Sequence, residues 1–350
     1  MLNKTKVTQL LGIEYPIVQG PFGGKFSTIM LTTQVSNLGG LGSFGLNSYS
    51  PAEILSINEE IRSTTNKPYN LNIWVPLKEE TPEPSVNEAA KAAFAPYFQR
   101  YGVNMPEAFP KVSDRFEAKL QALLEARPPV VSFIYGVPEK EALLEFRAKG
   151  IITMAVATSL EEALFLDQTL IDIIICSGTE AGGHRAAFMK STAQGYATTQ
   201  NLVTAALEKV KKPIIAAGGI RTAPHVRQYL NMGAGAVQIG SAFLATKASN
   251  ASDDHRAALL SEKPYETALT TVFSGREARV VKTNFVDETL GIDSLKFPYQ
   301  GKLMAPLRKK AEEMGSRAFE ALWSGVQTSP LIHREVEALF KSLINPDTEF

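Results

Sequence analysis

The clearest pattern along the chain is an alternation between short apolar runs and longer stretches with helical spacing. Each apolar run is bounded by residues that favour turns, which is typical of buried strands in a parallel sheet. Repeated strand–helix units of this kind predict an α/β fold. Eight apolar runs fit the description, at residues 16–19, 39–43, 69–74, 130–134, 151–156, 171–176, 213–217 and 235–239.

Helix-start and helix-stop signals lie between these runs. Ser50 precedes Pro51, as expected of an N-cap followed by a proline in the first turn, and Ser159 precedes acidic residues. A helix over 138–149 would end at Gly150. Eight strands with crossover helices favour a closed barrel, since open doubly wound sheets more often have fewer strands. We therefore expect an α/β protein with a (β/α)₈ TIM barrel.

Two segments are too long for the minimal barrel. We assign residues 1–247 and 307–350 to the barrel, with an insertion at about 76–127. Residues 248–306 follow the eighth strand, and we interpret them as a small, mostly helical second domain over the barrel mouth. Helical patterns in and after these segments cover residues 87–101, 112–125, 307–323 and 331–344.

Composition narrows the class of protein. The chain has 350 residues, of which 44% are hydrophobic and 21% charged, as in ordinary globular proteins. Lys plus Arg and Asp plus Glu are balanced at 36 each, so nucleic acid is not an expected partner. Neither a signal peptide nor a membrane span is predicted. The single cysteine, Cys176, excludes an intramolecular disulfide and a cysteine-cluster metal site, and we expect a cytoplasmic location with no bound metal.

Side-chain-poor turns follow the predicted strands at the barrel end where active sites lie. Gly218 and Gly219 follow the seventh strand, and Gly240 and Ser241 follow the eighth. These are the two loops that most often hold phosphate in such barrels, and backbone N–H groups there can face an anion without steric obstruction. Neither loop has Walker or dinucleotide spacing. The pair therefore predicts a phosphate site.

The rest of the mouth suits a flat ring. Gly20, Pro21 and Phe22 follow the first strand, and Asn72 on the third could hydrogen-bond a heterocycle edge, although it could equally cap a loop. The loop 178–184 after the sixth strand carries Gly182 and Gly183 and ends in His184, a catalytic candidate, although a single histidine is more often structural. A phosphate-tailed flat ring matches FMN.

These residues together resemble the nitronate monooxygenase family, formerly called 2-nitropropane dioxygenases. The resemblance extends from about residue 7 to about residue 325. The segments that carry it are residues 18–24, 70–74, 178–184, 215–220, 237–246 and 274–279.

The resemblance implies a barrel with a small helical domain that binds FMN without covalent attachment and oxidises nitronates with O₂ to a carbonyl compound and nitrite. It assigns the phosphate to the backbone of the 218–219 and 240–241 turns and the ring edge to Asn72. It places residues 20–22, Ala181, Gly182 and Gly183 beside the ring, with Ser177 among the cofactor-binding positions. It makes His184 the active-site base or the residue that orients the nitronate.

Several residues depart from the family pattern or have two interpretations. Pro21 and Phe22 stand where members often have a small residue and methionine, Ser177 stands where some have an acidic side chain, and no lysine follows the fifth strand. Arg276 and Arg279 could guard an anionic substrate or tie the second domain to the barrel. Glu180 is expected to hold its own loop. The remaining histidines are expected on surface helices without a catalytic role, namely His225, His255 and His333.

Two alternative functions remain open at this stage. The first is an FMN-dependent enoyl-acyl-carrier-protein reductase that uses NAD(P)H, since that type of enzyme shares the Gly-Gly-His loop. The second is a flavin-binding module without turnover. The expected partners are a small nitronate or nitroalkane and O₂, and the oligomeric state is open, with a homodimer as one candidate.

Overall fold

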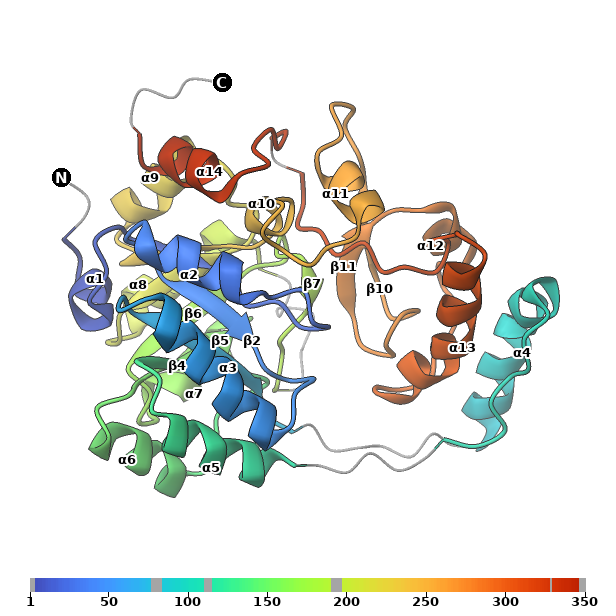
Figure 1. Ribbon diagram of the computed structural model, residues 1–350, viewed down its shortest axis with the longest axis horizontal. Coiled ribbons are helices and arrows are strands. Elements are labelled where there is room, and N and C mark those ends of the chain that lie inside the picture. Colours follow the sequence, from blue (N-terminus) through green and yellow to red (C-terminus); the bar gives the residue numbers. More distant parts are fainter. Residues whose placement is uncertain (1–3, 77–83, 110–114, 190–196, 328, 346–350) are drawn as a thin grey trace.

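The computed structural model describes residues 4–76, 84–109, 115–189, 197–327 and 329–345 (Figure 1). Residues 77–83 and 110–114 of the predicted insertion lie outside this part, as does the start of the helix predicted over 112–125. No helix in these described ranges combines the length and the apolar character that crossing a bilayer would require.

Eight parallel strands form the central sheet, in the order β1-β9-β8-β6-β5-β4-β3-β2. A parallel bridge between Val18 and Leu41 joins the two end strands, so the sheet closes into the predicted TIM barrel. The seventh and eighth barrel strands carry the labels β8 and β9, because β7 (Gly183–His184) belongs to another sheet. The barrel strands are β1 (Ile17–Gln19), β2 (Gly42–Gly45), β3 (Tyr69–Trp74), β4 (Val130–Ile134), β5 (Ile152–Ala157), β6 (Ile173–Ser177), β8 (Ile214–Ala217) and β9 (Ala236–Ile239).

The second barrel strand begins later than its apolar run suggests. The prediction was residues 39–43, whereas β2 starts at Gly42. Gly39 has a φ of 91°, in the left-handed region, and its carbonyl accepts hydrogen bonds from the backbone N–H groups of Glu14 and Tyr15. The first residues of the run therefore form a turn that leads into the strand.

Helices surround the barrel on its outer face (Figure 1). The predicted caps are confirmed. Ser50 and Glu53 form a capping box at the start of α3, and the Ser159 hydroxyl accepts a hydrogen bond from the Glu162 N–H at the start of α7. The helices of this part are α1 (Lys6–Leu11), α2 (Ile29–Asn37), α3 (Pro51–Thr64), α5 (Phe116–Ala126), α6 (Lys140–Ala148), α7 (Leu160–Asp167), α8 (Thr199–Lys209), α9 (Ala223–Met232), α10 (Ser241–Leu244) and α14 (Val336–Ile344).

Side chains alternate between two hydrophobic clusters along each strand. On β6, Ile173 and Ile175 belong to the cluster inside the barrel, whereas Ile174 and Cys176 belong to the cluster between strands and helices. Cys176 is fully buried there, and burial raises the pKa of its thiol to about 12, so it packs as a small apolar side chain as expected. The same alternation turns Ser177, the last residue of β6, toward the barrel interior at the mouth.

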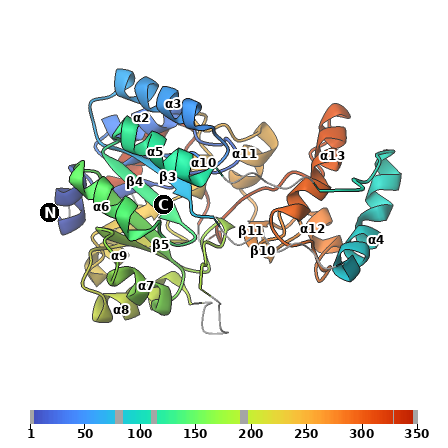
Figure 2. The same ribbon diagram turned by 90° about the horizontal axis from the view of Figure 1, so that it is seen from below.

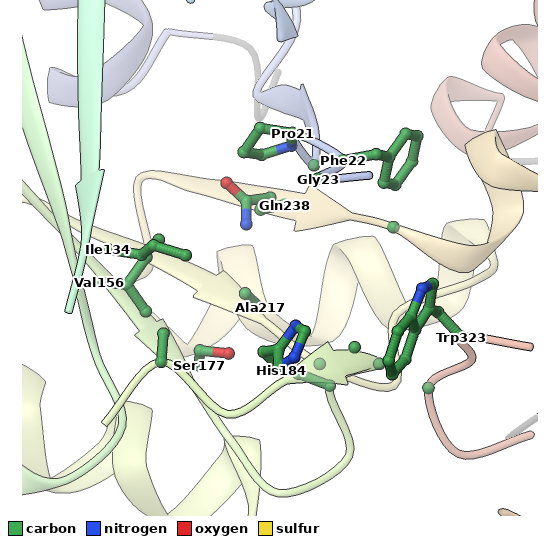
Figure 3. A pocket seen from close by; sticks show the side chains of 18 of the residues that line it. Pro21, Phe22, Gly23, Ile134, Val156, Ser177, His184, Ala217, Gln238 and Trp323 are labelled. Carbon is green, nitrogen blue, oxygen red and sulfur yellow. The ribbon is translucent and has the colours of Figure 1, made fainter. Parts of the chain in front are cut away.

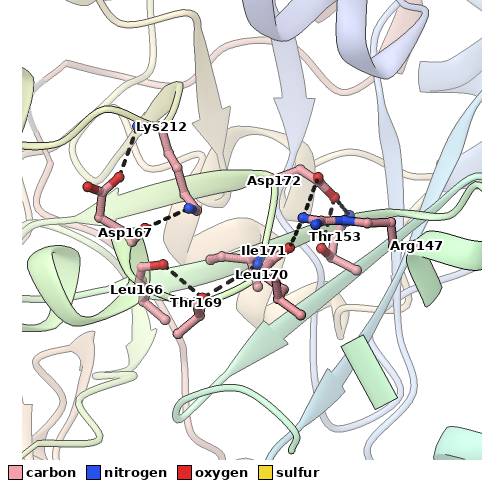
Figure 4. A network of polar contacts seen from close by, with 9 residues as sticks. All are labelled: Arg147, Thr153, Leu166, Asp167, Thr169, Leu170, Ile171, Asp172 and Lys212. Carbon is pink, nitrogen blue, oxygen red and sulfur yellow. Dashed lines mark hydrogen bonds and ion pairs between the residues drawn. The ribbon is translucent and has the colours of Figure 1, made fainter. Parts of the chain in front are cut away.

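A polar network lies at the opposite end of the barrel, where the strands begin (Figure 4). The Asp172 carboxylate accepts hydrogen bonds from the Thr153 N–H and hydroxyl at 2.8 and 2.9 Å, and Arg147 lies 3.9 Å away. Asp167 accepts a hydrogen bond from the N–H of Lys212 at 3.1 Å. In this fold the amino ends of the strands serve stability, so we assign these residues a structural role.

A second group of elements lies beside the barrel and contains strands as well as helices (Figure 2). Its antiparallel sheet has the order β10-β11-β7, and β7 carries His184. Helix α4 comes from the predicted barrel insertion, yet its Phe94 and Phe98 share a hydrophobic cluster with Leu303 and Leu307 of α13. Helix α13 also crosses the predicted boundary at residue 307. The elements of this group are α4 (Pro84–Tyr101), β10 (Thr267–Thr270), β11 (Ala278–Val281), α12 (Asn284–Glu288) and α13 (Tyr299–Glu313). Helix α11 (Asp253–Leu259) packs with the barrel instead, through Leu259. The division into domains stays a prediction.

Candidate active site

A cavity of about 430 Å³ opens at the carboxyl ends of the barrel strands (Figure 3). This volume lies within the usual range for small-molecule sites. The predicted catalytic residue and all of the predicted cofactor-binding residues line this one cavity, from turns that are far apart along the chain. These residues are Gly20, Pro21, Phe22, Asn72, Ser177, Ala181, Gly182, Gly183, His184, Gly218, Gly219, Gly240 and Ser241.

Strand alternation brings polar side chains to the floor of the cavity. Leu71 and Ile73 of β3 pack outward against helices, which turns Asn72 and Trp74 inward. The Asn72 amide N–H groups donate to the Ser132 carbonyl and hydroxyl at 3.1 and 2.9 Å. These two hydrogen bonds fix the orientation of the Asn72 amide. Its carbonyl oxygen is then the atom that can accept a hydrogen bond from a ligand.

The glycines around the cavity have two different roles. A Cβ on Gly182 would lie 2.4 Å from the Gly325 nitrogen, and one on Gly218 would lie 2.5 Å from the Thr199 hydroxyl. These two glycines are therefore required by the protein's own packing. A Cβ on Gly183 or Gly240 would have nothing within 4 Å, so these two glycines leave space for a ligand in the way that the sequence suggested.

His184 is held by the second sheet rather than by the barrel. It pairs with Ala278 of β11, and its ring lies against the rings of Trp74 and Trp323, with centroid distances of 5.5 and 5.1 Å. Its Nε2 lies 2.8 Å from the Ser274 hydroxyl oxygen. Among the described residues that line the cavity, His184 is the only histidine.

The Ser274 hydroxyl has two further hydrogen-bond contacts besides Nε2 of His184. The Ser274 hydroxyl donates its single hydrogen to the Arg276 carbonyl at 3.1 Å and accepts from the Arg276 N–H at 3.3 Å. When the hydroxyl hydrogen points at the Arg276 carbonyl, the Ser274 oxygen accepts from Nε2–H of His184 and the lone pair of the ring lies on Nδ1. Burial, and secondarily the nearby Arg276 charge, lower the pKa of His184 to about 4. The ring is thus neutral at neutral pH, which favours the role of active-site base.

The two arginines of the 274–279 segment make structural contacts. The Arg276 guanidinium lies 4.0 Å from the ring centroid of Tyr135 and donates to the Ala187 carbonyl. Arg279 donates to the Thr179 carbonyl at 2.8 Å, at the start of the His184 loop. Neither is among the described residues that line the cavity. These contacts therefore favour the interpretation that the two arginines connect the second group of elements to the barrel.

Glu180 has the structural role that we expected. Its carboxylate accepts hydrogen bonds from the Thr199 N–H and hydroxyl at 2.8 and 2.9 Å. The Thr199 hydroxyl in turn lies 3.1 Å from the Gly218 carbonyl oxygen. The loop after β6 is therefore coupled to the turn after β8.

The expectation of surface positions is wrong for one of the remaining histidines. His255 is fully buried, and its Nε2 lies 2.9 Å from the Trp323 carbonyl oxygen. Its spacing on α11 looks like that of a surface helix, but the Trp323 segment covers it in the fold. His225 and His333 are half-buried, and none of the three lines the cavity.

Sequence reasoning missed several lining residues. Trp74, Phe297 and Trp323 form an aromatic wall, and Phe297 and Trp323 come from segments with no chemical motif. Gln238 also lines the cavity, and its Oε1 is buried without a hydrogen-bond partner. The sequence does carry a signal for Gln238, because it is the polar residue in the otherwise apolar run 235–239. An orphaned acceptor at this position suits a ligand that carries a hydrogen-bond donor.

The barrel, its mouth cavity and a neutral imidazole over side-chain-poor turns define an α/β-barrel enzyme. Comparison with known proteins specifies the family. Residues 4–345 match the family model described as nitronate monooxygenase. A probable nitronate monooxygenase from Staphylococcus aureus (strain Newman) is 31% identical over 350 residues, covering 99% of this chain and 98% of the relative. The chain therefore belongs to the nitronate monooxygenase family and is an oxidoreductase.

Solved structures agree with this assignment. Nitroalkane oxidase from Streptomyces ansochromogenes has a TM-score of 0.87 and 31% identity, with 96% of each chain covered. FabK from Thermotoga maritima has a TM-score of 0.70 at 23% identity, with 97% of this chain and 94% of that chain covered, a likeness that concerns the fold alone. Together, the family and the nitroalkane oxidase likeness support flavin-dependent oxidation in general terms.

Proposed function

We propose that the protein oxidises alkyl nitronates with O₂ to a carbonyl compound and nitrite, with FMN bound in the mouth cavity. The observation that carries this proposal is the position of a single neutral imidazole, His184, over a cavity lined by glycine-rich turns. Neutral nitroalkanes are a second substrate class that the same geometry supports, because Nδ1 of His184 can accept the α-proton.

Three features of the cavity fit the cofactor. The phosphate-binding positions of this fold are occupied by Gly218, Gly219, Gly240 and Ser241, all of which line the cavity. The open space next to Gly183 and Gly240 leaves room for a ring and its tail. The orphaned Gln238 Oε1 offers an acceptor for a ring N–H or a ribityl hydroxyl.

The protein's own residues would position the substrate and move a proton. The aromatic wall of Trp74, Phe297 and Trp323 excludes water from the nitronate carbon. In the tautomer whose Nε2–H donates to Ser274, Nδ1 of His184 would be the base for a neutral nitroalkane. Bound FMN would supply the electron-accepting chemistry that no side chain here provides.

The cofactor assignment is tested on the purified protein. We expect a yellow preparation that releases FMN and no FAD, because the turns offer one phosphate site and no second pyrophosphate motif. A colourless protein that cannot be reconstituted with FMN contradicts the cofactor assignment.

The reaction is tested by anaerobic reduction of the bound flavin. We expect a nitronate to bleach it and NADPH to leave it oxidised, with nitrite released once O₂ is admitted. Rapid bleaching by NADH or NADPH would instead favour the enoyl-acyl-carrier-protein reductase. No bleaching by either reductant would favour a flavin-binding module without turnover.

A further inference from the structure

Arg221 is a buried arginine with only neutral partners. It follows the turn after β8, is 4% exposed and lines the mouth cavity. Its guanidinium donates to the Ser329 carbonyl at 3.1 Å, the Tyr265 hydroxyl at 2.9 Å and the Gly325 carbonyl at 3.1 Å. Within the described ranges, no carboxylate forms an ion pair with it.

An uncompensated charge at this depth is unusual. Burial of an ion is costly unless an opposite charge lies nearby, and backbone carbonyls and hydroxyls only partly replace water. Arg221 also faces the mouth cavity. We therefore expect an anion bound in that cavity to balance the charge of Arg221.

The contacts of Arg221 lead to the predicted phosphate turns. Arg221 comes two residues after Gly219, whose turn lines the cavity. Its partner Gly325 donates its N–H to the Ser241 hydroxyl at 2.9 Å, next to Gly240. The guanidinium thus places positive charge beside the 218–219 turn. It also holds Gly325, whose N–H hydrogen-bonds Ser241 in the 240–241 turn.

We propose that Arg221 is the positioning residue that makes the site selective for a phosphorylated flavin, because its buried charge is balanced by the phosphate dianion. This rests on the proposed function, since it assumes a flavin in the cavity. Riboflavin has the same ring and ribityl chain but no charge to offer, so Arg221 should contribute to the binding of FMN and not to that of riboflavin.

The test measures the affinity of the full-length protein for FMN and for riboflavin by flavin fluorescence after removal of endogenous flavin. Arg221→Gln should weaken FMN binding by about 30-fold or more, as expected when one partner of a desolvated charge pair is removed. Riboflavin binding should change by less than about threefold, which is within the effect of a lost neutral contact. Arg221→Lys should keep most of the selectivity for FMN, because the charge remains.

Arg308→Gln is the matched control. Arg308 is another half-buried guanidinium that donates to backbone carbonyls, those of Phe273 and Gly301, but it does not line the mouth cavity. Its loss should leave the ratio of FMN to riboflavin affinity unchanged. If Arg221→Gln lost affinity for both flavins equally, Arg221 would only hold its neighbouring segments together, and the proposal would be overturned.

A measurement on the unmodified protein covers the case in which Arg221→Gln does not fold. The second phosphate pKa lies near 6, so FMN affinity should fall between about pH 7.5 and 5 while riboflavin affinity stays level. A flat FMN profile would overturn the role of Arg221. Failure of the unmodified protein to bind either flavin would instead refute the proposed function itself.

Discussion

At the scale of single residues, the chemistry depends on one imidazole and on how its protons are arranged. His184 has a side-chain partner on Nε2, two tryptophan rings around it and a pKa of about 4. It differs from the other three histidines because it alone lines the cavity within the described part of the chain. Its removal should therefore affect catalysis more than cofactor binding.

We expect His184→Ala to retain FMN, because the phosphate and ring contacts are assigned to other loops. Activity on a neutral nitroalkane should fall by about 10²–10⁴-fold, the usual contribution of a general base. Activity on a preformed nitronate should fall less, since its proton is already gone. Steady-state kinetics on both substrates measure the difference, and equal losses would indicate positioning instead of proton abstraction.

The pH profile provides an independent check on the same base. Burial lowers the pKa of His184 to about 4, so the ring stays neutral from pH 7 down to that value. Activity on a neutral nitroalkane should be level in this window and then fall roughly tenfold per pH unit below it, as the base becomes protonated. A decline centred near the ordinary histidine pKa of about 6.5 would contradict the buried, neutral state.

At the scale of elements, the turns after the barrel strands act as a connected set. Glu180 and Thr199 join the loop after β6 to the turn after β8. The Gly182 backbone packs directly against Ser324 and Gly325. Glycines that look equivalent in the sequence are therefore required either by contacts between elements or by the open cavity.

Two glycine variants should separate these roles. Gly182→Ala places a Cβ 2.4 Å from the Gly325 nitrogen and should destabilise the protein by about 1–3 kcal/mol, as overpacking usually does. Gly240→Ala meets no atom within 4 Å and has a φ of −102°, so stability should be nearly unchanged while FMN affinity falls. Thermal unfolding and FMN titration of both variants check this. A Gly240→Ala variant with normal FMN affinity would place the phosphate elsewhere.

At the scale of the whole molecule, the barrel supplies the cavity and the second group of elements supplies the base. The pairing of β7 with β11 places His184 in the sheet of the second group, although its loop begins at a barrel strand. Helix α4 packs in that group with α13 (Figure 2). The two parts have different hydrophobic clusters, which meet at Trp323, and this supports the proposal of two domains.

If the two parts are separate domains, matched phenylalanine variants should affect different unfolding transitions. Phe94 lies in the second group and Phe146 packs against Phe133 of the barrel, and both are fully buried. Each change to alanine should cost about 3–5 kcal/mol. Phe94→Ala should lower the midpoint temperature of one calorimetric transition, and Phe146→Ala should lower that of another. If both variants shift a single transition equally, the molecule is one cooperative unit and the domain division is wrong.

The sequence by itself determined the barrel and the site turns, because both depend on local patterns. Strand periodicity, helix caps such as Ser50 and glycine turns act over a few residues and can be seen in one chain. Only the tertiary structure decided the rest. The partners of α4 and His255, the aromatic wall at Trp323 and the neutral partners of Arg221 depend on contacts between distant segments. Hydrophobic packing is non-directional, so the sequence shows which faces are apolar but not which segment covers them.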